Sequence, residues 1–147
     1  MSDLAKIKFG TDGWRAVIAR EYTFENVERV AQAYASYLAG NAGTDGPGLV
    51  VVGYDRRFLS ELFAQRAAEV LAGNDFKVFL FNEATPTPLI SWAVKELKAA
   101  GGVVITASHN PADFNGFKIK APWARQCLAG NDLRRRETRG RQSTQAH

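Results

Sequence analysis

The residues best suited to chemistry are three adjacent polar residues, Ser108, His109 and Asn110. They follow Val103–Thr106, a β-branched run after two glycines, which predicts a short buried strand. Pro111 ends the run, because proline has no N–H for a strand ladder and favours extended backbone in the residue before it. In open α/β sheets, ligands bind beyond the carboxyl ends of strands. The sequence therefore places a hydroxyl, an imidazole and a carboxamide at a ligand-binding edge.

Phosphate chemistry fits this stretch better than hydrolase chemistry. No Gly-x-Ser-x-Gly turn surrounds Ser108, and His109 is badly placed as its base because adjacent side chains usually point apart. A serine can instead carry a phosphoryl group, which adds negative charge and strong acceptor oxygens. The backbone amides of a turning loop can form an anion-binding concavity around such a group.

A basic segment follows this loop. Asn115-Gly116 is a strong turn signal, and residues 117–120 then alternate between apolar and basic side chains. Lys118 and Lys120 would therefore share one face of a strand. If that strand returns beside Val103–Thr106, it brings Lys118 back toward Ser108.

These residues carry a resemblance to a known family. Thr106–Pro111, followed by Asn115–Lys118, resembles the active-site loop of the α-D-phosphohexomutases, which include phosphoglucomutases, phosphomannomutases and phosphoglucosamine mutases. Phe9–Arg15 and Ala84–Pro88 resemble two further signatures of the same family. Together the matching stretches run from about residue 6 to Trp123.

The resemblance implies an isomerase that acts by intramolecular phosphoryl transfer on a hexose phosphate substrate. Ser108 would be the phosphoserine, which gives its phosphoryl group to a sugar monophosphate and recovers one from the resulting bisphosphate. Lys118 would act in acid–base or phosphate-stabilising roles, and His109 would line the site with it. Arg15 and Asn110 match positions that contact the substrate.

The resemblance also implies a cofactor and further domains. A Mg²⁺ ion would contact the phosphate on Ser108, which is the one metal ligand expected from this chain, and a hexose bisphosphate would act as activator. The family builds its cleft from four domains, whereas the matching stretches belong to the first. The acidic metal-binding loop and the sugar-recognition loop do not appear in the sequence. We therefore expect a fragment that needs the missing domains for activity, with its sugar left open among glucose, mannose and glucosamine.

Several alternatives remain open at this stage. Taken singly, Ser108 could be a turn residue, Lys118 a solvated lysine, and Arg15 the partner of a nearby acid. The segment Tyr54–Arg57 could touch a ligand or could hold a loop through an Asp–Arg pair. Two other classes of function compete with the enzyme, namely a non-catalytic phosphate- or sugar-phosphate-binding module and an arginine-tailed nucleic-acid binder.

The pattern of strands and helices predicts an α/β fold, a three-layer α/β/α sandwich with a mostly parallel mixed sheet. Each of the first four predicted strands is followed by a helix or by the serine loop, and the last strand is expected to run antiparallel. Thr23, Ser60 and Thr87 are the predicted helix caps, with Pro88 at the first helical position. The predicted strands are 6–9, 49–53, 76–81, 103–106 and 117–120; the predicted helices are 23–40, 60–73 and 89–99.

The composition limits the remaining possibilities. With 147 residues, 46% of them hydrophobic, the chain is long enough for one ordinary folded domain, which we place at residues 1–123. No apolar run is long enough to span a bilayer, the first residues lack a secretory hydrophobic region, and Cys127 is the only cysteine. We expect a cytoplasmic protein with no membrane partner.

The net charge of +4 arises outside the predicted domain. Residues 1–123 contain equal numbers of basic and acidic residues, whereas residues 124–147 contain six arginines and two acids. This arginine-rich stretch has few large apolar residues, so we expect it to be disordered or to come from an out-of-frame join. Nucleic-acid binding is not expected, because no aromatic residues are interleaved with the arginines for base stacking.

Overall fold

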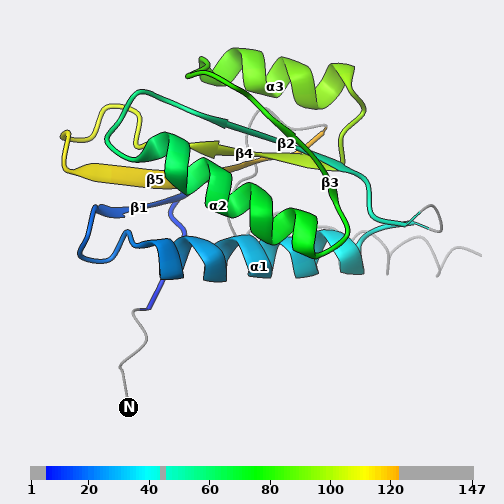
Figure 1. The fold of residues 1–147 in the computed structure, drawn as a ribbon, viewed down its shortest axis with the longest axis horizontal. Coiled ribbons are helices and arrows are strands. Elements are labelled where there is room, and N and C mark those ends of the chain that lie inside the picture. The colour runs from blue at the N-terminus through cyan, green and yellow to red at the C-terminus, as the bar shows by residue number, and fades with distance from the viewer. Residues whose placement is uncertain (1–5, 44–45, 123–147) are drawn as a thin grey trace, which may run out of the picture.

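The computed structural model describes residues 6–43 and 46–122, so the predicted arginine-rich tail lies outside the described residues. Within these described residues, eight elements follow one another (Figure 1). The strands are β1 (Trp14–Val17), β2 (Leu49–Tyr54), β3 (Lys77–Leu80), β4 (Gly101–Ile105) and β5 (Phe114–Lys120). The helices are α1 (Phe24–Gly40), α2 (Ser60–Gly73) and α3 (Thr87–Glu96).

The five strands form one mixed sheet in the order β1-β5-β4-β2-β3. The β2–β3 and β2–β4 pairs are parallel, whereas β5 pairs antiparallel with both β4 and β1. Four strands therefore run in one direction and β5 runs against them. This confirms the predicted mixed, mostly parallel sheet and the antiparallel last strand.

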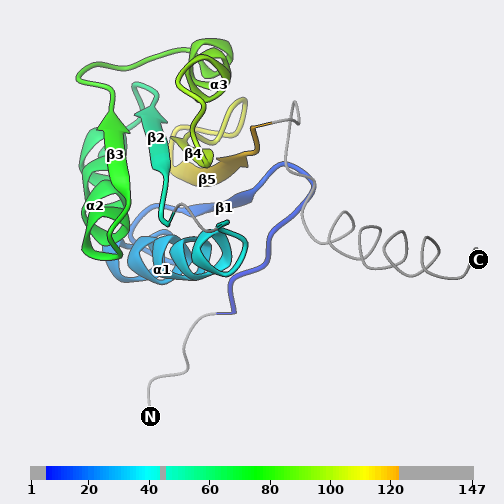
Figure 2. The same ribbon diagram turned by 90° about the vertical axis from the view of Figure 1, so that its right-hand side faces the viewer.

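The helices cover the two faces of the sheet unequally. α1 and α2 lie on one face, and α3 lies on the other, which gives three layers (Figure 2). The larger core lies under α1 and α2 and includes the stacked rings of Trp14 and Tyr22, with Phe63 edge-on to Tyr22. The smaller core joins α3 to β2 and β4 through Ile90, Val94 and Val104.

The central strands follow directly from their composition. All five residues of β4 are buried, as are Val50 to Tyr54 in β2, because both strands are covered on both faces. Helix α1 begins where predicted, with the Thr23 hydroxyl accepting a hydrogen bond from the Asn26 amide at 3.2 Å.

Two predictions about strands and turns are wrong. Residues 6–9 form no strand, and the first strand is β1. Its short sequence, an apolar run interrupted by Arg15, gives too weak an alternation to predict a strand. Asn115-Gly116 is not the hairpin turn but lies inside β5, and the turn comes earlier, at residues 106–113. Glycine is needed at position 116 because the neighbouring backbone approaches closely: a Cβ would lie 2.4 Å from the Thr106 carbonyl oxygen and 2.9 Å from that of Trp14.

Two predicted caps are also wrong. The residue before α2 is Leu59, which has φ 61°, and the Ser60 hydroxyl bonds to Asp55 instead of capping the helix. Pro86 precedes α3, so Thr87 is already helical and caps nothing with its side chain. For α2, the Ser60 hydroxyl is engaged by a tertiary contact, and for α3, Pro86 takes the position before the helix. In both cases the helix begins one residue earlier than local propensity predicts.

Helix α3 is shorter than predicted and only half covered. It ends at Glu96, with Ile90, Ala93 and Val94 facing the sheet and Leu89 and Trp92 exposed. Across the described ranges 6–43 and 46–122, no helix is long and apolar enough to cross a membrane.

Candidate active site

Ser108 lies in the turn that joins β4 to β5, residues 106–113, which we call the serine turn. Its side chain is exposed just beyond the carboxyl end of β4, as the sequence predicts. Its φ of 54° is in the left-handed region, which costs a non-glycine residue about 1–3 kcal/mol and is concentrated at functional sites. The Thr106 hydroxyl accepts a hydrogen bond from the Ser108 amide at 3.0 Å and supports this conformation.

Lys118 reaches Ser108 from the neighbouring strand. The register pairs Lys118 with Val104, so its side chain lies on the α3 side of the sheet. Its Nζ lies 2.5 Å from the Ser108 Oγ and 2.8 Å from an Asp12 carboxylate oxygen. The lysine therefore bridges a hydroxyl and a carboxylate while its own side chain is 8% exposed.

A tight turn brings Asp12 to this lysine. Gly13 follows it with φ 93°, and a Cβ at Gly13 would lie only 2.4 Å from the Phe117 carbonyl oxygen. Only glycine permits this close approach of the turn to β5. The result is that Asp12 contacts Lys118 although 106 positions separate them in the sequence.

Arg15 completes this polar group from β1. Its guanidinium forms an ion pair with Asp12 and donates a hydrogen bond of 2.5 Å to the side-chain oxygen of Asn110 in the serine turn. The simple alternative, an arginine paired with a nearby acid, is therefore also present. The same guanidinium links that acid to the turn that carries Ser108.

The electrostatics favour an anionic ligand. Burial raises the pKa of the Asp12 carboxyl, but the hydrogen bond and charge of Lys118 and the charge of Arg15 outweigh it and lower the pKa. Burial and the nearby Lys118 charge lower the pKa of Lys120, which lies on the same face of β5. Asp12 thus stays ionised between Arg15 and Lys118. The two cations and the one carboxylate leave a net charge of one positive unit, which suits a phosphoryl group on Ser108.

A partly buried chain of hydrogen bonds ties the serine turn to the start of α2. The Asp55 carboxylate accepts from the hydroxyls of Thr106 at 2.6 Å and Ser60 at 2.7 Å. The Ser60 hydroxyl accepts in turn from the side-chain amide of Asn115 at 2.9 Å. One carboxylate after β2 therefore connects the start of α2 with both strands that flank Ser108.

Arg57, two residues further along, holds the serine turn from outside. Its guanidinium donates to four backbone carbonyl oxygens, those of Ser108, Asn110, Pro111 and Phe114. Its Nε lies 3.4 Å from Asp55. Figure 1 shows the β2–α2 and β4–β5 connections side by side at one end of the sheet. Of the two interpretations of Tyr54–Arg57, the Asp–Arg pair that holds a loop is present.

The structure brings most of the predicted site residues together. Ser108, Lys118, Arg15 and Asn110 are joined by direct contacts or through Asp12. His109 is exposed in the same turn and takes no part in the contacts that join these residues within the ranges 6–43 and 46–122.

Sequence reasoning did not assign a site role to Asp12 or Thr106. The Asp-Gly pair at a predicted loop was the one signal that could have indicated Asp12. Thr106 stands at the start of the family-like stretch Thr106–Pro111, but its partner Asp55 is 51 positions away and no local pattern indicates that contact.

The described residues contain little that could hold a metal. Within the ranges 6–43 and 46–122, no group of three or more His, Cys, Asp or Glu side chains gathers in one place. Asp12, the carboxylate that shares Lys118 with Ser108, is already paired with two cations. A Mg²⁺ ion would therefore depend on phosphoryl oxygens for its contact with this part of the chain.

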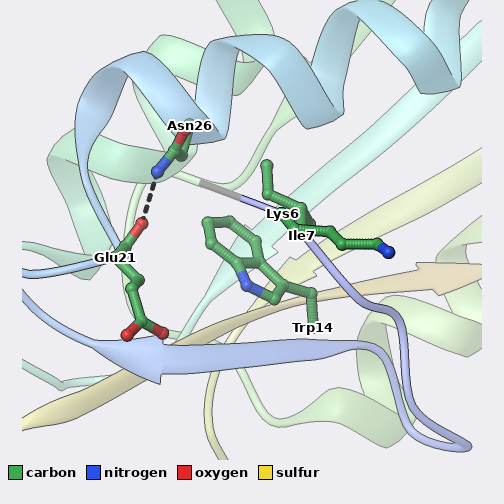
Figure 3. A pocket seen from close by; sticks show the side chains of 5 residues that line it. All are labelled: Lys6, Ile7, Trp14, Glu21 and Asn26. Carbon is green, nitrogen blue, oxygen red and sulfur yellow. Dashed lines mark hydrogen bonds between the residues drawn. The ribbon is translucent and has the colours of Figure 1, made fainter. Parts of the chain in front are cut away.

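A separate hollow lies on the opposite face of β1. It measures about 320 Å³ and is lined by Lys6, Ile7, Trp14, Glu21 and Asn26 (Figure 3). The side-chain amide of Asn26 donates to the Glu21 backbone carbonyl oxygen at 2.7 Å, so this polar group is already satisfied. Because Trp14 and Arg15 are adjacent in a strand and point to opposite faces, the hollow does not open onto the serine turn.

Comparisons with known proteins show which family the sequence matches. The family description "Phosphoglucomutase/phosphomannomutase, alpha/beta/alpha domain I" matches residues 6–130. A "Probable phosphoribomutase" from Schizosaccharomyces pombe is 40% identical over 125 residues, which cover 83% of this chain and 21% of the relative. A phosphoglucomutase from Staphylococcus epidermidis is 41% identical over 119 residues, 77% of this chain and 21% of the relative.

Solved structures show the same fold. A crystal structure of a Thermus thermophilus protein described as a phosphomannomutase superposes with a TM-score of 0.76 at 51% identity and covers 80% of this chain and 26% of its own. A Burkholderia thailandensis protein of the phosphoglucomutase/phosphomannomutase family, at 23% identity, shares the fold alone with a TM-score of 0.71 over 92% of this chain. The chain thus spans about a fifth of the length of the curated relatives it matches.

Proposed function

Because this chain belongs to the phosphoglucomutase/phosphomannomutase family through its α/β/α domain I, we propose that Ser108 carries a phosphoryl group during the isomerisation of a hexose phosphate. The single observation that carries the proposal is the 2.5 Å contact between the Ser108 Oγ and the Lys118 Nζ. A hydroxyl exposed at a strand end, with a buried lysine against it, is the arrangement an activated nucleophile needs.

The proposed step is a phosphoryl transfer between two oxygens. When a hexose bisphosphate donates, the bond from phosphorus to the sugar oxygen breaks and the bond from phosphorus to the Ser108 Oγ forms. The hydroxyl proton leaves Oγ, and the released sugar oxygen accepts a proton. Lys118 is placed to accept the proton when neutral or, when charged, to balance the transferred phosphoryl group.

The neighbouring residues have supporting roles in this proposal. Arg15 orients the serine turn through Asn110 and adds a second positive charge, while Asp12 fixes the positions of both cations. His109, exposed beside Ser108, is proposed to line the site and contact the substrate only once it is bound. Phosphoryl transfer depends chiefly on such positioning and charge stabilisation.

The proposed cofactor is Mg²⁺, which would neutralise charge on the phosphoryl group of Ser108. The described residues supply no carboxylate cluster for it, so its remaining ligands are proposed to come from outside residues 6–122. The groups that select glucose, mannose or glucosamine are likewise proposed to lie outside this domain.

Covalent labelling tests the proposal. Incubation with glucose 1,6-bisphosphate and Mg²⁺ is expected to add one phosphoryl group at Ser108, measured by peptide mass spectrometry. Ser108→Ala removes the acceptor and should abolish the label, while Ser91→Ala, on α3, should leave it unchanged. A label that persists in Ser108→Ala would contradict the proposal.

The non-catalytic phosphate-binding module remains the second candidate, because the same excess of positive charge would also hold a free phosphate. Calorimetric binding of inorganic phosphate without any covalent label would favour that candidate. Labelling at Ser108 would favour the enzyme.

A further inference from the structure

We propose that Arg57 is the positioning residue of the serine turn, which keeps the Ser108 hydroxyl within reach of Lys118. This inference rests on the proposed function, because what Arg57 positions is the oxygen that carries the phosphoryl group. Arg57 does not touch the reacting atoms. It acts through the backbone of the turn.

The contacts of Arg57 run from Ser108 within the turn to Phe114, the first residue of β5. Its Nη2 donates to the carbonyl oxygens of Ser108 at 2.9 Å and Asn110 at 2.6 Å. Its Nη1 donates to those of Pro111 at 2.6 Å and Phe114 at 3.1 Å. One guanidinium thus satisfies four acceptors spread over seven consecutive residues.

Other contacts restrain the ends and the side chains of the turn. The Thr106 amide donates to the Gly116 carbonyl oxygen at 3.0 Å and the Ile18 amide to that of Asp113 at 2.8 Å. The side chains of Asn110 and Ser108 are held by Arg15 and Lys118.

The internal backbone hydrogen bonds of the turn are those of the Asn110 amide to Ala107 and of the Phe114 amide to Pro111, both 3.0 Å. At Ser108 itself, the left-handed φ of 54° is supported by the Thr106 hydroxyl on the amide side and by Arg57 on the carbonyl side. Without the guanidinium, one of these two restraints disappears and the strained conformation can relax.

Arg57 is itself held in place. Its side chain is 14% exposed, and its Nε faces Asp55, whose carboxylate is bonded to Thr106 and Ser60. The guanidinium is therefore presented to the turn from the connection between β2 and α2, where Asp55 holds it in place. Fixed donors aimed at fixed acceptors are what positioning requires.

This role is separable from the stability of the domain. Arg57 belongs to neither hydrophobic cluster, and β4 and β5 pair through their own backbone hydrogen bonds. A change at Arg57 should therefore loosen the turn and leave the sheet intact. Lysine cannot replace it fully, because one ammonium cannot reach four carbonyl oxygens that are served by two separate nitrogens.

The chain offers a matched control. Arg56 is the adjacent arginine with the same charge, and its side chain is exposed to solvent. Arg57→Ala, Arg57→Lys and Arg56→Ala should be compared with the unchanged full-length chain. Arg57→Lys keeps the test possible if Arg57→Ala does not fold.

The first measurement is amide hydrogen exchange, which does not depend on any activity. Arg57→Ala is expected to speed exchange at Ser108 and Asn110 about ten-fold or more, with no change at Val103–Ile105. Arg56→Ala should change neither group. Turn exchange at the original rate in Arg57→Ala would overturn the inference, whatever the outcome of labelling.

The second measurement is the rate of Ser108 labelling by glucose 1,6-bisphosphate. Arg57→Ala should lower the labelling rate at saturating donor about ten-fold or more, with little change in the half-saturating donor concentration. The rate of Arg57→Lys should lie between those of Arg57→Ala and the unchanged chain. Millimolar guanidinium should partly restore the labelling rate of Arg57→Ala. Equal rates in Arg57→Ala and the unchanged chain would overturn the inference and leave the proposed function standing. Absence of label in the unchanged chain would instead count against the proposed function, while exchange still decides whether Arg57 holds the turn.

Discussion

The two faces of the β1–β5 strand pair have opposite character, one apolar and one charged, although alternate residues of the same two strands form both faces. Toward α1 and α2, these strands place Trp14 and Phe117 in the main hydrophobic core. Toward the other face they place Arg15 and Lys118, which surround the serine turn with charge. Helix α3 covers β2 and β4 on that face and leaves the β1–β5 side to the polar residues (Figure 2).

This difference teaches how a two-stranded edge can serve stability and chemistry at once. Because side chains alternate along a strand, each strand contributes to both faces without compromise. The apolar face anchors the backbone, and the anchored backbone holds the cations at fixed positions. We therefore expect substitutions on the two faces to have separable effects, on the free energy of unfolding and on Ser108 labelling respectively.

The largest expected effect compares neighbours in β5. Phe117→Ala should lower the free energy of unfolding by about 3–5 kcal/mol, because Phe117 is completely buried and its loss leaves a cavity. Lys118→Met keeps about the same side-chain volume and leaves Asp12 paired with Arg15, so it should lower the free energy of unfolding by less than Phe117→Ala, yet it should strongly slow labelling of Ser108. Urea denaturation followed by circular dichroism measures both stabilities. Equal destabilisation by the two substitutions would refute the separation of the faces.

The next effect tests how closely the strands approach beside the site. Gly116→Ala should lower the free energy of unfolding by about 1–3 kcal/mol, because its new methyl group would collide with the carbonyl oxygens of Thr106 and Trp14. Gly73→Ala is the control, since no atom lies within 4 Å of a Cβ there. In thermal unfolding experiments, the control should be neutral or slightly stabilising. A neutral Gly116→Ala would show that the strands can separate without cost.

A smaller effect tests the helix starts on the two faces. Thr23→Ala should cost about 1 kcal/mol of unfolding free energy, because its hydroxyl caps α1. Thr87→Ala should change it by less than about 0.5 kcal/mol, since Thr87 provides no side-chain cap to α3. Chemical denaturation of the two variants measures the difference, and neither substitution should alter Ser108 labelling. A larger loss for Thr87→Ala than for Thr23→Ala would contradict the assigned caps.

The smallest effect concerns pH and the charged face. The folded chain lowers the pKa of Asp12, so ionised Asp12 contributes stability above its ordinary pKa of about 3.9, and this contribution is lost as the pH falls through the lowered value. Asp12→Asn should therefore be slightly less stable than the unchanged chain at pH 7, and the difference should shrink as the pH approaches 3. Urea midpoints at pH 7, 5 and 3.5 measure this. A difference that grows on acidification would have the wrong sign.

The fold was largely predictable because its strongest signals are local. The β-branched runs in β2 and β4 and the Thr23 cap needed no knowledge of distant residues, and the structure confirms them. Errors occurred where a long-range contact overrides a local preference. Ser60 looks like a cap but bonds to Asp55, and Asn115-Gly116 looks like a turn but is held in β5 between two strands.

The sequence by itself determined which groups can do chemistry here. Strand alternation placed Lys118 and Lys120 on one face, and it indicated that a return strand beside β4 would bring Lys118 toward Ser108. Only the tertiary structure decided that Asp12 lies against Lys118 and that Arg57 serves the serine turn. These contacts join segments more than 50 positions apart, and no local pattern encodes which distant carboxylate or carbonyl a cation will meet. That choice is made when the sheet order places β1 beside β5 and β2 beside β4, which sets the Asp12 turn against Lys118 and the β2–α2 connection against the serine turn.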